Sequence, residues 1–258
     1  MKVIWETVVV AFSMFTALPM PRVTWNSQNL RYVFCAFPLI GGVMGLLWAA
    51  WAWVSQTLGL EALLRAAGFC LLPVLLTGGI HLDGYADTCD ALASYGAPAK
   101  RQEILKDPHC GAFAVIRLCA YLIGYFSLCG TLVPTDRAIV CMGAGFMLSR
   151  VLSGFAIVTF PLAAHTGLAR QFGESANPKR VRALLIVYAI ALLAGLTLIG
   201  RLVGMGMAAV AFFLLWRYRR VAVEQFGGIS GDLAGWFVQR TELWMLAALV
   251  AGQIGGAI

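Results

Sequence analysis

The sequence predicts an all-α, polytopic integral membrane protein, and three observations carry this prediction. Of the 258 residues, 60% are hydrophobic and only 12% are charged, whereas soluble domains are typically about 45–50% apolar and about 25% charged. The mean hydropathy is +0.82. The apolar residues gather in runs close to the roughly 20 residues that cross a bilayer. We therefore expect a helical bundle of about seven transmembrane helices that forms a single membrane domain over residues 1–258.

The apolar runs give the expected elements in chain order. Val3–Leu18 carries Glu6 and ends at Pro19, so it is short for a span and predicts an interfacial or re-entrant helix. Seven longer runs predict the spans: Leu30–Leu58, Ala62–Ile80, Ala112–Val133, Ala138–Ala163, Val181–Gly200, Leu202–Val223 and Leu243–Ile258. We expect the last run to be entered from a helix that begins near Ser230.

The basic residues alternate between the two sides of this bundle. Thirteen of them fall in one set of loops: Lys2, Arg22, Arg31, Lys100, Arg101, Lys106, Arg170, Lys179, Arg180, Arg182, Arg217, Arg219 and Arg220. The opposite loops hold only Arg65, Arg137 and Arg201. By the positive-inside rule the first set is cytoplasmic. The same pattern accounts for the net charge of +7, so we expect no nucleic-acid partner.

An aspartate cluster at the end of the second run is the main chemical feature. Asp83, Asp87 and Asp90 are spaced i, i+4, i+7, which places them on one face of a helix. Their mutual repulsion is relieved if a cation binds, and oxygen ligands alone favour Mg²⁺ shared with substrate phosphates. A solvated acidic helix end is the alternative. His81 lies off this face. It is a general base, a phosphate contact or a structural residue.

Cations and a glycine-rich turn accompany the aspartates. Lys106 either binds a phosphate or is one of the basic loop residues that follow the positive-inside rule. Arg150 lies within an apolar run, where an ionisable group is costly, so it is either functional or paired with a carboxylate. In the turn Gly227–Gly231, backbone N–H groups can approach a phosphate, and Asp232 is a fourth metal ligand or a base. The alternative is a tight connection capped by Ser230 or Asp232.

Together these groups favour phosphoryl or nucleotidyl transfer, in which metal and cations neutralise phosphate charge. The catalytic face would be formed by cytoplasmic loops around residues 78–111, 164–182 and 217–242. One alternative is a phosphotransferase of the CDP-alcohol type, although such enzymes have Arg where Asp87 stands. The other is an ion-coupled transporter, which predicts carboxylates near the bilayer centre and an inverted repeat. No repeat is evident.

Four blocks in chain order resemble the cobalamin synthase family, the adenosylcobinamide-GDP ribazoletransferases. The blocks are Phe15–Pro19, Thr77–Ala91, Glu103–Asp107 followed by Gly111–Phe113, and Gly227–Gly235 with Glu242 beyond. The second block, Thr-Gly-Gly-Ile-His-Leu-Asp-Gly-Tyr-Ala-Asp-Thr-Cys-Asp-Ala, is the most specific. Two positions depart from the family pattern, because Ala17 stands where a basic residue is usual and Ser230 where threonine is usual.

The resemblance implies an Mg²⁺-dependent inner-membrane enzyme that joins α-ribazole, or its 5′-phosphate, to adenosylcobinamide-GDP and releases GMP late in vitamin B12 synthesis. It implies metal ligation by Asp83, Asp87, Asp90 and Asp232. It implies substrate binding by Lys106, Arg150, Gly227, Gly228, Ser230, Gly231 and Glu242. The proton acceptor would be His81 or one of Asp83, Asp87 and Asp90. The partners would be the two substrates, membrane lipid, and either a second copy of the chain or other corrinoid-pathway enzymes.

Overall fold

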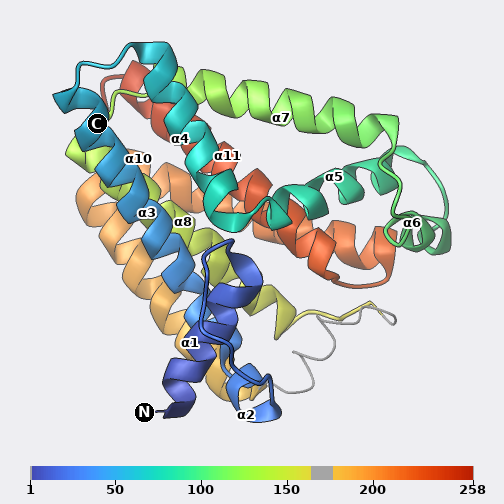
Figure 1. Ribbon diagram of the computed structural model, residues 1–258. Helices are drawn as coiled ribbons and strands as arrows, with labels where there is room; N and C mark the ends of the chain where they lie inside the picture. Colours follow the sequence, from blue (N-terminus) through green and yellow to red (C-terminus); the bar gives the residue numbers. More distant parts are fainter. Residues whose placement is uncertain (1, 164–176, 258) are drawn as a thin grey trace.

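A computed structural model describes residues 2–163 and 177–257, and these residues are helical apart from connections and one isolated bridge between Leu162 and Ile229. The helices are α1 (Lys2–Phe15), α2 (Ser27–Leu30), α3 (Val33–Thr57), α4 (Ala62–Thr77), α5 (Ile80–Ala93), α6 (Pro98–Ile104), α7 (Ala112–Thr131), α8 (Asp136–Ile157), α10 (Pro178–Phe226) and α11 (Gly231–Ile254) (Figure 1). The stretch 164–176, which includes Arg170 and part of the expected catalytic face, lies outside the described residues.

The all-α membrane architecture is confirmed. Four described helices, α3, α7, α8 and α10, are long and apolar enough to cross a membrane, and the bent pair α4 and α5 would make a fifth span. Arg201 has non-helical backbone angles (φ 49°, ψ −128°) and divides α10 between the predicted fifth and sixth runs. A Cβ on Gly204 would collide with the carbonyl group of Leu196, so the chain turns back sharply there. The last predicted run lies in α11, which begins after Ser230 as expected.

Helix α8 lies at the centre of the bundle. In the most apolar stretch of 18 residues of α8, 78% is buried inside the protein, whereas the corresponding share is 22% for α7 and 17% for α10. Helix α3 crosses it closely, since a Cβ on Gly45 would lie 2.8 Å from the Cα of Gly143. Small residues allow such backbone approach between membrane helices. The apolar side chains on the outer faces of α7 and α10 are therefore placed to contact lipid.

The N-terminal helix is shorter than a span, as predicted. At about 1.5 Å per residue its 14 residues extend about 21 Å, against a hydrocarbon core of about 30 Å. It packs against α3. Beyond it, the backbone N–H of Ala17 donates to the carbonyl of Leu76 at 2.8 Å. The N-terminal segment is thus fastened to the end of α4.

The second predicted run forms α4, which ends at Thr77, and the aspartates do not continue this helix. Gly78 (φ 62°) and Gly79 (φ 81°) adopt left-handed conformations, which glycine accepts without steric penalty. Helix α5 therefore leaves α4 at 93°. The aspartates lie on this separate helix, which packs against α11 and α7 (Figure 1).

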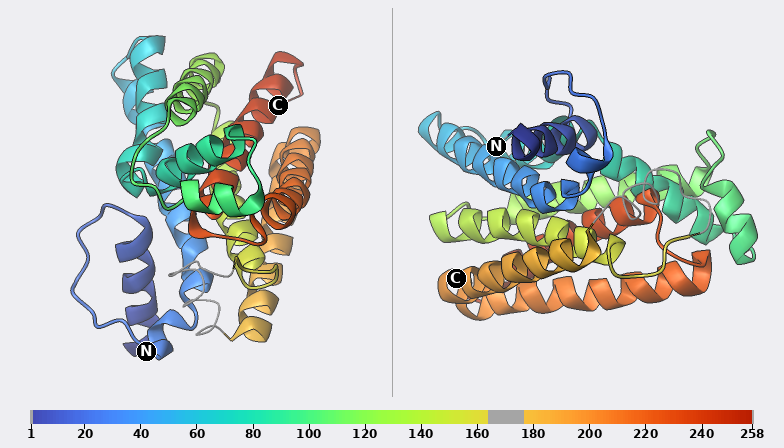
Figure 2. Two further views of the ribbon diagram at one scale, coloured as in Figure 1. Left: turned by 90° about the vertical axis from the view of Figure 1, so that its right-hand side faces the viewer. Right: turned by 90° about the horizontal axis from the view of Figure 1, so that it is seen from below.

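The connections that are poor in basic residues lie at one end of the bundle. The α3–α4 and α7–α8 connections and the C-terminus meet at the upper left of Figure 1, whereas α6 lies on the opposite side. The Gln253 side chain bonds the backbone N–H and carbonyl of Val133 at 3.0 and 2.7 Å, and Gln56 donates to the carbonyl of Pro134 at 3.0 Å. Figure 2 shows the same long helices from two further directions. This grouping agrees with the alternation expected from charge.

Candidate active site

Helices α5 and α11 touch through their backbones. A Cβ on Gly84 would lie 2.7 Å from both the Cα and the carbonyl oxygen of Asp232, and a Cβ on Gly235 would lie 3.0 Å from the carbonyl oxygen of His81. Only glycine allows this approach, which places Asp232 directly beside the aspartate helix. This crossing is not among the features predicted from the sequence, although the spacing of Gly231 and Gly235 is a known signal for close helix packing.

The four predicted aspartates form one acidic cluster. Asp83 is exposed, while Asp87 and Asp90 are half-buried on the same helix. Asp87 is repelled by all three other carboxylates, two on α5 and one on α11. Within the described residues none of the four takes part in an ion pair. In the described part of the chain, the fold thus concentrates negative charge that no ion pair compensates.

Asp90 has a partner of its own. Its Oδ1 accepts a hydrogen bond from the backbone N–H of Ala114 at 3.3 Å, and its carboxylate packs against Gly111. Both residues lie at the N-terminus of α7, where a negative charge is favourable. Asp90 is therefore engaged in joining α5 to α7, which distinguishes it from Asp83 and Asp87.

A cavity of about 370 Å³ opens beside the acidic cluster, between α1, α3, α5, α8 and α11. Its apolar lining includes Phe15, Trp25, Phe34, Phe37, Ile80 and Ile157, and its polar lining includes His81, Asp83, Ser153 and Asp232. The structure thus brings His81, Asp83 and Asp232 together on one cavity. The aromatic residues come from separate parts of the chain, and only Phe15 belongs to a recognised block.

His81 is enclosed by aromatic rings. Its side chain lies next to Phe15 and Phe37, with ring centroids 6.2 and 5.8 Å away. The residue is 5% exposed. Its Nε2 atom has no hydrogen-bond partner within the described residues. Most buried polar atoms have partners, and an unpaired one is unfavourable, so His81 lines the cavity and retains one unused hydrogen-bonding atom that the protein encloses.

Arg150 and Glu242 pair with each other. The Arg150 guanidinium donates to Glu242 at 2.6 Å, and the hydroxyl of Ser149 donates to the same oxygen at 3.1 Å. The two charged side chains are 0% and 1% exposed. The sequence left two interpretations of Arg150, a functional residue or one paired with a carboxylate. The structure shows the pair with a carboxylate. Neither residue lines the cavity, and substrate contact by Arg150 or Glu242 stays a prediction.

The glycine-rich turn is built by bonds within the chain. Gly227 (φ 71°) and Gly228 (φ 152°) have positive φ angles. Their N–H groups donate to the carbonyls of Val223 and Ala222 at 3.1 and 2.9 Å. A Cβ on Gly228 would lie 2.5 Å from the backbone of Leu162. These two glycines are thus required by the turn, and their amides are already occupied in this conformation.

The end of this turn begins α11. Ser230 is its N-cap, and the Ser230 hydroxyl accepts from the backbone N–H of Leu233 at 3.2 Å. Ser230 therefore caps the helix, which is one of the two roles that the sequence left open for this residue. Gly231 follows as the first helical residue and lines the cavity next to Asp232. The positive end of the α11 dipole accordingly opens toward the cavity.

Lys106 lies outside the cavity lining. It is exposed in the connection after α6, and α6 is held to the end of α10 because Gln102 donates to the carbonyl of Phe226 at 2.5 Å. In the same connection the backbone N–H of His109 donates to Asp107 at 2.9 Å and lowers the pKa of that carboxyl. Lys106 thus follows a helix that is held beside the glycine-rich turn, and its side chain is exposed.

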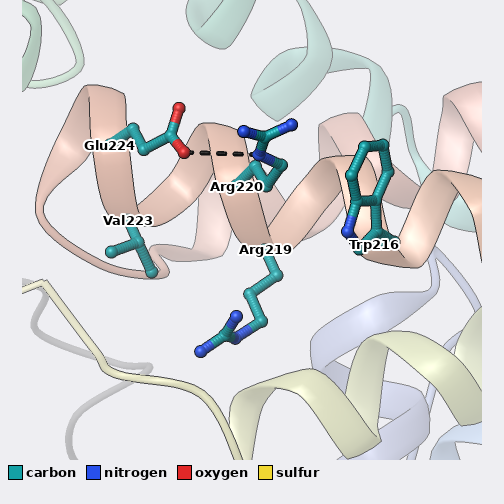
Figure 3. A pocket seen from close by; sticks show the side chains of 5 residues that line it. All are labelled: Trp216, Arg219, Arg220, Val223 and Glu224. Atoms are coloured by element: carbon teal, nitrogen blue, oxygen red, sulfur yellow. Dashed lines mark hydrogen bonds and ion pairs between the residues drawn. The ribbon is translucent and has the colours of Figure 1, made fainter.

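A second hollow of about 450 Å³ lies along the C-terminal half of α10 (Figure 3). Its lining is Trp216, Arg219, Arg220, Val223 and Glu224. Arg220 lies over the Trp216 ring at 5.0 Å and contacts Glu224 at 3.4 Å. A single helix supplies all five side chains, and tryptophan with arginine is typical of a membrane interface. This hollow is therefore an interfacial groove separate from the acidic cavity.

Comparisons with known proteins agree with the resemblance of the blocks. The model of the Cobalamin-5-phosphate synthase family matches residues 7–250. The chain is 38% identical to an adenosylcobinamide-GDP ribazoletransferase of Lachnoclostridium phytofermentans, over 95% of this chain and 93% of that protein. It is 31% identical to proteins of the same name from Clostridium perfringens (94% and 96%) and Geobacillus kaustophilus (98% and 100%). No solved structure matches the chain. The chain belongs to the cobalamin-5-phosphate synthase family.

Proposed function

We propose that this membrane protein transfers ribazole to adenosylcobinamide-GDP with release of GMP, a late step of cobalamin synthesis, and that transfer takes place at the cavity beside the acidic cluster. One observation carries the location of the site. Asp83 and Asp232 belong to motif blocks that lie far apart in the chain, Thr77–Ala91 and Gly227–Gly235, yet they line one cavity. The crossing at Gly84 holds them there.

The reaction requires a nucleophile, a proton acceptor and stabilisation of the leaving group. A ribose hydroxyl of ribazole attacks the phosphorus that bears the cobinamide, and a new P–O bond forms. The P–O bond to the bridging oxygen breaks, and GMP leaves with that oxygen and its negative charge. The hydroxyl proton passes to a carboxylate on the cavity wall, Asp83 or Asp232, at a distance typical of general-base catalysis in the substrate complex.

Phosphate charge needs cations. Lys106 lies exposed on a connection near the cavity-bearing end of α11, where its flexible ammonium group can reach the donor. The N-terminus of α11 adds a favourable dipole for an anion. These two features orient the diphosphate toward the carboxylates while the cobinamide remains outside.

Mg²⁺ is the metal that the donor set suits. The cluster offers only carboxylate oxygens, mutually repelling and without ion pairs among the described residues. Among the described residues, no three acidic, histidine or cysteine side chains are placed to hold a metal ion together, so substrate phosphates would have to supply the remaining ligands. Mg²⁺ is commonly held by one or two carboxylates together with substrate phosphates. One or two of Asp83, Asp87 and Asp232 would hold it, with Asp90 at the edge, and it would supply charge neutralisation.

We place the cavity on the cytoplasmic side of the bacterial inner membrane. The support is the excess of basic residues in the loops opposite the end that carries Arg65 and Arg137. Association with a second copy of the chain or with other corrinoid-pathway enzymes stays a prediction from the sequence.

The test is a transfer assay of the purified protein in lipid nanodiscs. Adenosylcobinamide-GDP and α-ribazole are supplied with and without Mg²⁺, and the corrinoid product and GMP are both measured. We expect both only with the metal. The variants Asp83→Asn and Asp232→Asn should lose about 10²-fold or more in rate, while Asp136→Asn, an exposed carboxylate at the far end of α8, should not. Absence of corrinoid product with every divalent metal would overturn the proposal, and GMP release excludes both alternatives from the sequence.

A further inference from the structure

We propose that the aromatic cavity binds the base of ribazole and that His81 donates a hydrogen bond to it. This inference rests on the ribazole transfer proposed above, and it adds which substrate the cavity takes and how its base is recognised. The cavity is the one lined by Phe15, Trp25, Phe37 and His81, with Asp83 and Asp232 on its wall.

The size of the cavity selects between the two substrates. Its volume of about 370 Å³ is near the lower end of small-molecule sites, which run from roughly 300 to 1,000 Å³. Adenosylcobinamide-GDP is a corrin macrocycle that carries both an adenosyl group and a nucleotide, and is much larger than a drug-sized ligand. Ribazole is a single nucleoside. The cavity therefore accommodates the acceptor and leaves the donor outside.

The lining matches the base. The base of ribazole is a dimethylated benzimidazole, a flat apolar bicycle with one unsubstituted ring nitrogen that accepts a hydrogen bond. Phe15, Trp25 and Phe37 supply aromatic surface on which such a ring can pack. The lining on the α1 and α3 side is apolar apart from Ser13, while its carboxylates come from α5 and α11. This division suits a nucleoside with an apolar base and a polar sugar.

His81 supplies the complement of the base nitrogen. The side chain is almost fully buried, and its Nε2 has no partner within the described residues. In the tautomer that carries its proton on Nε2, the imidazole donates one hydrogen bond. The protein encloses this atom in the ligand-free conformation, so the imidazole must turn toward the cavity to donate, and a ligand acceptor would then satisfy an atom that the protein leaves unpaired. Sites of this kind discriminate strongly against analogues that lack the matching group.

The same placement positions the ribose. With the base between the aromatic rings, the sugar lies toward Asp83 and Asp232, on the part of the lining where Asp83 and Gly231 are exposed. The nucleophilic hydroxyl is then next to the carboxylates, at the side from which the larger donor must arrive. Base recognition and proton removal are thus assigned to different residues, His81 and the aspartates.

The test measures binding of nucleosides without any donor. Two ligands are compared in nanodiscs by calorimetry: α-ribazole, and an analogue in which the accepting ring nitrogen is replaced by C–H. We expect the protein to bind α-ribazole about tenfold more tightly, the size of one well-formed hydrogen bond. The variant His81→Phe keeps an aromatic ring but removes the donor, so its two dissociation constants should be equal within about twofold. A preference that survives in His81→Phe would overturn the inference, as would absence of α-ribazole binding to the unmodified protein.

Trp25 provides a second variant that does not disturb the core. It is 46% exposed, and Trp244 on α11, outside the cavity, is 50% exposed. Trp25→Ala should weaken both nucleosides by about tenfold through lost stacking, while Trp244→Ala should leave both unchanged. Equal effects of the two substitutions would place the nucleoside elsewhere.

Kinetics separate this inference from the transfer reaction itself. His81→Phe should raise KM for α-ribazole by about tenfold and keep kcat within about threefold, because binding and not chemistry is affected. A large fall in kcat at saturating α-ribazole would make His81 the proton acceptor and overturn the binding role. Nucleoside discrimination without GMP release would instead leave the base site intact and overturn the proposed transfer.

Discussion

Gly84 of α5 lies directly against the backbone of Asp232 of α11, so that a methyl group on Gly84 would stand 2.7 Å from the Cα and the carbonyl oxygen of Asp232. The position of the fourth carboxylate relative to the other three is set by this contact. Any side chain at residue 84 must push the two helices apart, because backbone atoms cannot rotate away as a flexible side chain can.

Gly84→Ala should therefore damage the site. We expect a loss of about 10²-fold in transfer rate, as a displacement of about 1 Å in catalytic groups produces, together with a destabilisation of about 1–3 kcal/mol from overpacking. The measurements are GMP release and thermal unfolding in detergent. Gly206→Ala in α10 is the matched control, because a Cβ there meets nothing within 4 Å. Equal activity of the two variants would show that the crossing does not position the carboxylates.

The buried pair of Arg150 and Glu242 gives a prediction on stability. Arg150→Met leaves a fully buried carboxylate unpaired and should destabilise the fold by about 3–5 kcal/mol. The double variant Arg150→Met with Glu242→Leu removes both charges and should recover most of that loss. Chemical unfolding in detergent measures both. The exposed pair of Arg220 and Glu224 is the control, for which Arg220→Met should change stability by less than about 1 kcal/mol.

The same double variant also tests substrate contact. A stably folded double variant that retains transfer activity would assign the pair to the structure alone. A folded but inactive one would support the substrate-binding roles that the sequence predicted for Arg150 and Glu242.

The aspartates of α5 should differ in their effect on metal. Asp87 faces three other carboxylates, whereas Asp90 accepts from the backbone of Ala114, an acceptor role that asparagine can keep. We expect Asp87→Asn to raise the Mg²⁺ concentration for half-maximal activity by at least about tenfold, and Asp90→Asn by less than about threefold. Titration of activity with Mg²⁺ measures this. Identical curves for the two variants would contradict the graded role.

The orientation in the membrane can be read from one native thiol. Cys110 is exposed in the connection before α7. With Cys119, the other exposed cysteine, replaced by Ser, a membrane-impermeant maleimide should label Cys110 in inside-out vesicles and not in intact spheroplasts. The control is Ala257→Cys with Cys110 and Cys119 both replaced by Ser, which should show the opposite pattern. Labelling of Cys110 from outside would reverse the proposed topology.

The sequence by itself determined the membrane class, the family and the chemical character of the site. Apolar runs and short basic loops are local properties, and a helix needs only its own residues to place Asp83, Asp87 and Asp90 on one face. The break at Arg201 also falls between two predicted runs. Ser230 likewise acts as the cap that its residue type and position predict.

Only the tertiary structure decided how these parts meet. The 93° bend depends on two consecutive left-handed glycines, Gly78 and Gly79, whose conformations the apolar pattern does not encode. The pairing of Arg150 with Glu242 and the aromatic enclosure of His81 join residues far apart in the chain. Such contacts arise from packing between helices, where a glycine that lets two backbones touch matters more than any local propensity. For that reason the aspartate face was predictable from the sequence, and the cavity beside it was not.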